Sequence, residues 1–90
     1  MLIRPFHDCT PEIHPAARLA ETAAVIGEVI LAENVTVWYD AVLRGDVGPI
    51  RIGRGSNIQD NCAVHCAVDV PTVVGENVVV GHGAILHSCT

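Results

Sequence analysis

Apolar residues recur along this chain every six positions, and a small or β-branched residue follows each of them four positions later. Two short interruptions, at residues 49–51 and 70–73, break the register, and each contains a proline. The pairs are Ile13/Ala17, Leu19/Ala23, Val25/Val29, Leu31/Val35, Val37/Ala41, Leu43/Val47, Ile52/Ser56, Ile58/Cys62, Val64/Val68, Val74/Val78, Val80/Ala84 and Leu86/Thr90, which makes twelve hexads.

A six-residue repeat of this kind is typical of a parallel β-helix. Each hexad predicts a short strand and a turn, with its first residue pointing into a narrow core. Three hexads make one triangular coil, so twelve make about four, stacked at the ~4.8 Å spacing of neighbouring strands. The interruptions, with Pro49 and Pro71, predict loops that protrude from a corner of the coil. We expect an all-β fold with a lead-in at residues 1–12 and a repeat domain at 13–90.

The repeat places two histidines and an arginine in one outward column. Arg44, His65 and His87 are each the second residue of every third hexad, so they lie one coil apart on one face. Neighbouring backbones are then ~5 Å apart and both imidazoles point outward. Two imidazoles in this arrangement can converge on a zinc ion.

His82 belongs to a different face of the predicted prism. It is the third residue of its hexad, directly above Asp60, and Gln59 lies beside Asp60. Within its own chain His82 therefore points away from His65 and His87. A lone histidine on a turn is usually solvated, but a three-histidine site forms if a second chain presents His82. Three-fold packing of triangular prisms would do this, so the sequence predicts metal sites between subunits.

Composition and charge exclude several classes of function. The net charge is −5 and the chain has no lysine, which disfavours a nucleic-acid surface. No apolar run approaches the ~20 residues of a membrane span, and the N-terminus lacks the apolar core of a signal peptide. We therefore expect a cytoplasmic protein without nucleic-acid or membrane partners.

The cysteines Cys9, Cys62, Cys66 and Cys89 are expected as free thiols, because no secretory signal is present. A cysteine-ligated structural zinc is a less favoured alternative. Cys62 occupies an inward fifth position, and Cys66 and Cys89 lie at other hexad positions than the paired histidines. His7 and His14 fall outside the columns and are expected on the surface.

Three segments resemble the γ-class carbonic anhydrases and the γ-carbonic-anhydrase-like bacterial proteins of the hexapeptide superfamily. They are VWYDAVLRGD (37–46), IRIGRGSNIQDNCAVH (50–65) and VVVGHGAILH (78–87). The resemblance runs from about residue 10 to the last residue. It implies a left-handed parallel β-helix and a homotrimer. It also implies that the metal ligands are His65, His82 and His87, with zinc, ferrous iron or cobalt as the ion.

The resemblance also implies roles for four polar residues. Arg44 and Asp46 match an arginine–aspartate pair that helps hold the subunits together and is implicated in substrate or bicarbonate binding. Gln59 matches a glutamine that contacts the metal-bound water. Asp60 matches an aspartate that pairs with the arginine at the interface. A surface salt-bridge cluster worth little free energy is the competing interpretation of the charged three.

The implied function is reversible hydration of CO2 to bicarbonate by metal-bound hydroxide. The best-characterised members carry glutamates, including a proton shuttle, in extended acidic loops. Here Asp46 is followed by Val47-Gly48-Pro49, and His65 by Cys66-Ala67-Val68-Asp69. A weakly active or inactive metal-binding or assembly protein of the same family is therefore an alternative. A hexapeptide acyltransferase, with a histidine as general base and an acyl-CoA substrate, is less favoured.

The family continues for several coils and usually finishes with a helix packed on the prism. This sequence stops at Thr90, the fifth position of the twelfth hexad. The last coil would expose an open edge, which natural repeat proteins cap. We therefore expect the chain to be C-terminally truncated relative to the family.

Overall fold

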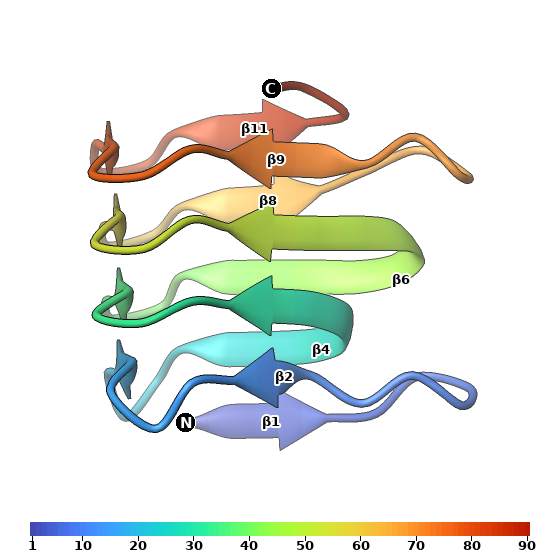
Figure 1. Ribbon diagram of the computed structural model, residues 1–90, viewed down its shortest axis with the longest axis horizontal. Helices are drawn as coiled ribbons and strands as arrows, with labels where there is room; N and C mark the ends of the chain where they lie inside the picture. The colour runs from blue at the N-terminus through green and yellow to red at the C-terminus, as the bar shows by residue number, and fades with distance from the viewer.

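The computed structural model describes residues 1–90 as eleven β-strands joined by turns, without a helix. The strands stack as the rungs of a solenoid (Figure 1). No helix is present that could cross a membrane. The strands are β1 (Leu2–Arg4), β2 (Glu12–Ile13), β3 (Arg18–Leu19), β4 (Ala24–Leu31), β5 (Thr36–Val37), β6 (Val42–Ile52), β7 (Asn57–Ile58), β8 (Ala63–His65), β9 (Thr72–Val74), β10 (Val79–Val80) and β11 (Ile85–His87).

The strands form a prism with three faces, and all of them pair in parallel. Face A consists of β1, the first part of β4, the first part of β6, β8 and β11. Face B consists of β2, the second parts of β4 and β6, and β9. Faces A and B are one seven-stranded sheet, because β4 and β6 bend through the corner between them. Face C is the separate four-stranded sheet of β3, β5, β7 and β10.

The predicted coil number is confirmed by the register of face A. The inward positions of face A are Ile3, Val25, Leu43, Val64 and Leu86. Each pairs with the next one turn of the solenoid later, so the chain makes four turns between Ile3 and Leu86. The first of these turns begins in the expected lead-in, because β1 pairs with β4 as the first rung.

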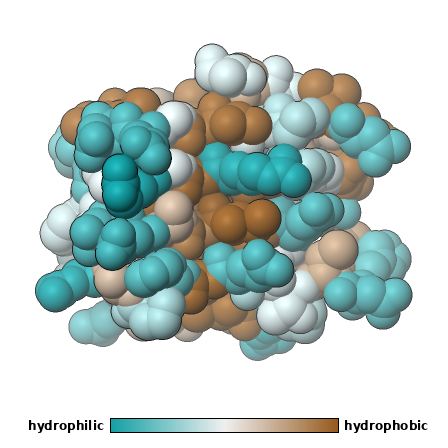
Figure 2. All heavy atoms as spheres, in the orientation of Figure 1, coloured by the Kyte–Doolittle hydropathy of each residue, from teal (hydrophilic) through white to brown (hydrophobic).

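The core is narrow and aliphatic, as the repeat predicts. A cluster of 16 buried residues fills it, and no aromatic residue is among them. Figure 2, in the same orientation, shows apolar side chains interrupted by polar ones over the stacked strands. Ser56 and Thr72 are the buried polar residues, and both hydroxyls are hydrogen-bonded. Parallel strands that bury small branched side chains need no bulky residue to fill the bore.

The predicted bounds of the protruding loops, 49–51 and 70–73, are wrong. Val47 and Val68, at the fifth positions of their hexads, are 39% and 68% exposed. Ile50 and Thr72 take their places, are fully buried, and pair with each other. The inserted residues therefore precede the fifth position instead of following the hexad.

The bend of β6 shows where the residues enter. Gly45 pairs with Gly27, and Ile50 pairs with Val29, so residues 46–49 lie opposite Glu28 alone. The strand absorbs three extra residues as a bulge at the corner between faces A and B. The loop 66–71 projects from the same corner one rung higher (Figure 1).

Candidate functional site

His65 and His87 lie side by side on face A. Strand β8 ends at His65 and β11 ends at His87, and the two residues are paired in register. Their ring centroids are 5.5 Å apart with an interplanar angle of 48°. Alternation along each strand sends the preceding residues, Val64 and Leu86, inward and the imidazoles outward. The column inferred from the hexads is therefore present.

Asp46 links this histidine pair to Arg44. Its Oδ2 accepts a hydrogen bond from Arg44 Nη1 at 3.0 Å, and its Oδ1 lies 2.7 Å from His65 Nε2. The Asp46 side chain is only 13% exposed. Burial would raise the pKa of its carboxyl, but the hydrogen bond to His65 and the charges of Arg44 and His65 outweigh burial and hold the pKa below its ordinary value.

The ionised Asp46 fixes the orientation of the His65 ring. The His65 nitrogen that faces the carboxylate is Nε2, so Nε2 carries the proton that is donated, and in the neutral ring the lone pair is then on Nδ1. While this contact holds, Nδ1 of His65 is the nitrogen free to bind a metal. A metal at Nε2 would have to displace Asp46.

A buried threonine holds the two histidine strands together. The hydroxyl of Thr72 donates to the carbonyl of His65 at 2.7 Å and accepts from the N–H of Ser88 at 2.8 Å. Ser88 directly follows His87, so one core hydroxyl connects the backbones that carry both imidazoles. The hexad pattern does not point to this residue, because Thr72 falls in the interruption 70–73 that was predicted as a loop.

His82, Asp60 and Gln59 form a second cluster on the turns that follow face C. His82 Nδ1 lies 3.4 Å from Asp60 Oδ1, and the side chains are 72% and 39% exposed. The backbone N–H of Gly83 donates to the Asp60 carbonyl, which keeps the two turns stacked. Gln59 is half-buried one residue before Asp60. Asp60 was expected to pair with an arginine at an interface, and its partner within the chain is His82.

The two clusters are separate within the chain. No group of three or more His, Cys, Asp or Glu side chains is gathered closely enough to hold a metal ion. The face A cluster nevertheless has suitable chemistry, because adjacent neutral imidazoles are good ligands for zinc and related ions. One chain thus presents two neighbouring candidate ligands on face A and a third at a different place.

The cysteines do not contribute to either cluster. All four are free, and Cys62 and Cys66 are buried. Burial raises the pKa of the Cys66 thiol, and the charges of Asp46 and Glu28 raise it further, which keeps it protonated and a poor metal ligand. The burial of Cys66 was not predicted; its sulfur packs where a side chain on Gly48 would lie.

Comparisons with known proteins place this architecture. No family model matches the chain. It is 50% identical over 72 residues to a probable carbonic anhydrase of Methanocaldococcus jannaschii, covering 80% of this chain and 45% of the relative. It is 44% identical over 89 residues to the mitochondrial gamma carbonic anhydrase 3 of Arabidopsis thaliana, covering 92% of this chain and 34% of the relative.

The solved structures agree on the fold. The crystal structure of a hexapeptide transferase family protein from Anaplasma phagocytophilum superposes with a TM-score of 0.94 at 43% identity, covering 99% of this chain and 52% of that one. The fold is therefore the left-handed β-helix of the hexapeptide-repeat class, as predicted. Within that class the chain is similar over most of its length to proteins named carbonic anhydrase, including gamma carbonic anhydrases. It spans less than half the length of these two curated relatives.

Proposed function

We propose that the protein is part of a metal-dependent carbonic anhydrase that interconverts CO2 and bicarbonate in a homotrimer. Each site would combine His65 and His87 of one subunit with the partner subunit's His82. The observation that carries this proposal is the division of the three imidazoles between face A and the turns after face C. Similarity to relatives named carbonic anhydrase supports CO2 and bicarbonate as the substrates.

The three imidazoles would hold zinc, ferrous iron or cobalt, since nitrogen ligands suit all of these ions. When bound, the ion would lower the pKa of a coordinated water towards neutrality and supply the nucleophile. The residues of the chain would do the rest. Arg44, whose side chain is 51% exposed, is available to neutralise the bicarbonate anion. Gln59 would orient the attacking group through its side-chain amide.

Asp46 would act on His65 and not on the substrate. Its carboxylate holds the proton at His65 Nε2 and keeps the ring aligned with that of His87. With Asp46 engaged in this way, Asp69 is the remaining carboxylate in the neighbouring insertions, and it is exposed on the loop 66–71. Proton export from the site would therefore rely on solvent or on Asp69.

Subunit complementation tests the divided site. His65→Ala leaves the face C cluster intact, and His82→Ala leaves the face A cluster intact. We expect neither variant alone to bind zinc at the site or to hydrate CO2. Mixed and reassembled trimers should regain metal and activity, at about one site in four for random mixing. Failure to regain metal in verified mixed trimers would contradict the intersubunit site.

A second function, metal binding without appreciable turnover, is favoured by one observation. The insertions beside the site are lined by Val47, Val68 and Val70, which are exposed, and carry no glutamate. Stopped-flow hydration of CO2 by the zinc-loaded trimer separates the two functions. Full metal occupancy without hydration would assign the protein to the second. Acyl transfer from an acyl-CoA by the same preparation would instead favour the hexapeptide transferases.

A further inference from the structure

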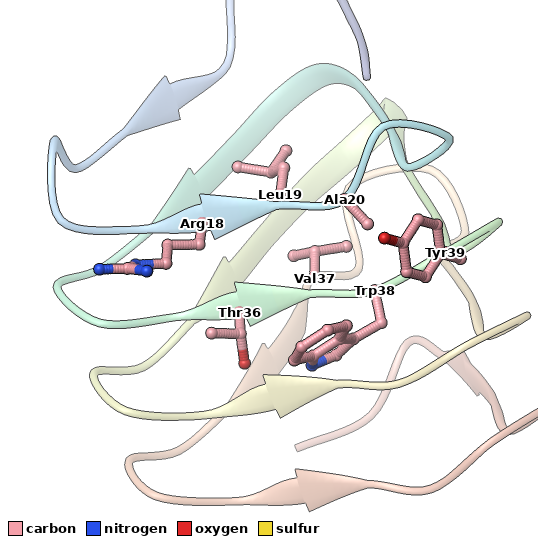
Figure 3. A pocket seen from close by; sticks show the side chains of 7 residues that line it. All are labelled: Arg18, Leu19, Ala20, Thr36, Val37, Trp38 and Tyr39. Carbon is pink, nitrogen blue, oxygen red and sulfur yellow. The ribbon is translucent and has the colours of Figure 1, made fainter.

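An aromatic groove lies on face C, below the cluster that contains His82. It has a volume of about 410 Å³. Trp38 and Tyr39 are 42% and 48% exposed, although they are the only tryptophan and tyrosine of the chain. Figure 3 shows the indole of Trp38 between Thr36 and Tyr39, open to the outside of the prism. The groove is lined by Arg18, Leu19, Ala20, Thr36, Val37, Trp38 and Tyr39.

The groove shares its columns with the second half of the site. The hydrogen bonds of the turns place Tyr39, Asp60 and His82 one above another on successive coils, and Trp38 below Gln59. The aromatic pair is therefore continuous with the surface that would present His82 to another subunit. A large exposed aromatic surface of this kind marks a contact with a partner.

Face A carries a matching apolar stripe. Leu2, Ala24, Val42, Ala63 and Ile85 pair in register up the whole face and form one outward column, here called the apolar column. Leu2, Val42 and Ile85 are 42%, 36% and 78% exposed. The next outward column runs from Arg4 through Ile26 to Arg44, and His65 and His87 continue it one residue after the paired Leu43, Val64 and Leu86. The apolar column thus runs directly beside the paired histidines.

The heights of the two surfaces agree. Tyr39 lies two coils below His82. Ile26 lies two coils below His65, and Arg44 lies two coils below His87. A threefold axis parallel to the prism keeps every residue at its own height. If His82 reaches the level of the partner's histidine pair, the aromatic groove must therefore face the partner's rungs β4 and β6.

The chemistry at that level is complementary. The facing rungs present Ala24 and Val42 from the apolar column, together with Ile26 and Arg44. An exposed guanidinium beside two aromatic rings can add a cation–π contact. Asp40 and Asp60 lie beside the aromatic end of the groove and Arg18 lines its other end, whereas Arg4 and Arg44 are the charged residues of the opposite column. Opposite charge around an apolar centre favours a specific contact.

We propose that Trp38 and Tyr39 anchor a second copy of this chain by packing on Ala24, Ile26 and Val42 of its face A. This inference rests on the proposed intersubunit site and adds the contact that holds the two half-sites at the correct height. The metal ligands then close a site that the aromatic anchor has already aligned.

The single tryptophan reports on the contact directly. We expect Trp38 emission of the wild-type chain to shift to the blue and its acrylamide quenching to fall as chain concentration and zinc drive assembly, measured beside sedimentation velocity. Trp38→Ala should raise the dissociation constant of the trimer by about 30-fold or more, as expected for a central aromatic anchor. Ile30→Ala, on face B, removes apolar surface outside the contact and should leave the trimer unchanged.

The receiving surface is tested separately. Val42→Glu places a carboxylate in the apolar column and should weaken assembly with Trp38 left in place as a reporter, so its emission stays red-shifted. Arg51→Glu introduces the same carboxylate on face B and is the control. Circular dichroism and thermal midpoints show whether each variant is folded. Equal assembly of folded Val42→Glu and Arg51→Glu would overturn the proposal.

His82→Ala separates this inference from the proposed function. If trimers of this variant form without metal and bury Trp38, the anchor is supported whatever the catalytic role. If the wild type forms a zinc-loaded trimer in which Trp38 remains fully accessible to quencher, the anchor is wrong and the divided metal site stands. If the emission and the acrylamide quenching of Trp38 stay the same at every chain concentration and zinc level, the anchor is wrong in this chain.

Discussion

The two halves of the candidate site differ in how firmly contacts within the chain hold their histidines. On face A, His65 is held by Asp46, Asp46 is held by Arg44, and Thr72 joins the backbones of both histidine strands. After face C, His82 has one carboxylate contact at 3.4 Å and is 72% exposed. In the proposed trimer, one subunit would therefore pre-organise a pair of ligands, and the third would become ordered only on contact with the neighbouring subunit.

Two glycines give the largest expected contrast between these regions. Gly27 and Gly83 both have a positive φ, 77° and 69°. A Cβ on Gly27 would lie 2.3 Å from the Gly45 carbonyl oxygen, whereas a Cβ on Gly83 would meet nothing within 4 Å. Gly83→Ala should cost about 1 kcal/mol from the backbone conformation alone, and Gly27→Ala about 3 kcal/mol or more because a clash is added.

Urea unfolding of both variants measures the difference. The same φ penalty applies to each, so Gly83→Ala is the matched control for the clash. Equal losses in the two variants would show that the corner between faces A and B can relax, and that face A is less rigid than its hydrogen bonds indicate.

The Thr72 hydroxyl provides the next contrast. Thr72→Val keeps the shape but leaves the His65 carbonyl and the Ser88 N–H without their bridge, which should cost about 1–3 kcal/mol. Ser56→Ala is the control, because its buried hydroxyl also bridges two backbone groups, at Gly75 and Val78, away from the paired histidines. Zinc titration of the assembled protein should show weaker binding for Thr72→Val and unchanged binding for Ser56→Ala.

Removing the charge from each carboxylate that contacts a histidine should lower stability by different amounts, because Asp46 is largely buried and Asp60 is exposed. Asp46→Asn weakens a largely buried contact with His65 and Arg44 and should lower stability by about 1–2 kcal/mol. Asp60→Asn affects an exposed contact and should change the unfolding midpoint too little to resolve. The NMR signals of the His65 ring should move in the first variant only. A large loss of stability in Asp60→Asn would show that the face C cluster is more ordered than its exposure indicates.

A smaller effect follows from the lowered pKa of Asp46. A carboxyl with a lowered folded-state pKa stabilises the fold above its ordinary pKa of 3.8 and loses this contribution as the pH falls through the folded-state value. The gap in stability between the wild type and Asp46→Asn should be constant above about pH 5 and narrow in more acidic solution. Chemical unfolding across this range tests it, and a gap that widens on acidification would contradict the assignment.

Much of this architecture could be read from the sequence because a solenoid repeats one local rule. The six-residue pattern was sufficient to place His65 above Arg44 and to put His82 on another face. It failed where residues enter the repeat, because Val47 and Ile50 are equally good core residues by composition. Only the pairing of Ile50 with Val29 decides between them, and that is a long-range contact.

The supporting contacts of the site were less predictable for a related reason. The hydrogen bond of Asp46 to His65 depends on the bulge that turns the carboxylate back towards β8, and the bridging role of Thr72 depends on the corrected register. Trp38, Tyr39 and Phe6 are the only Trp, Tyr and Phe residues of the chain. The positions of Trp38 and Tyr39 in the hexads do not show which outward residues a partner covers.

The bulge between Gly45 and Ile50 has a consequence for how such a protein can change over evolutionary time. Residues 46–49 and the loop 66–71 both enter at one corner, and the rungs on either side keep their register. That corner is therefore an insertion point at which sequence can be gained or lost without retuning the core. It adjoins Asp46 and His65, so length variation there would alter the chemistry next to the histidines while the scaffold stays the same. A variant of the protein with a flexible tag or an acidic loop inserted between Val68 and Val70 should fold as readily as the natural chain.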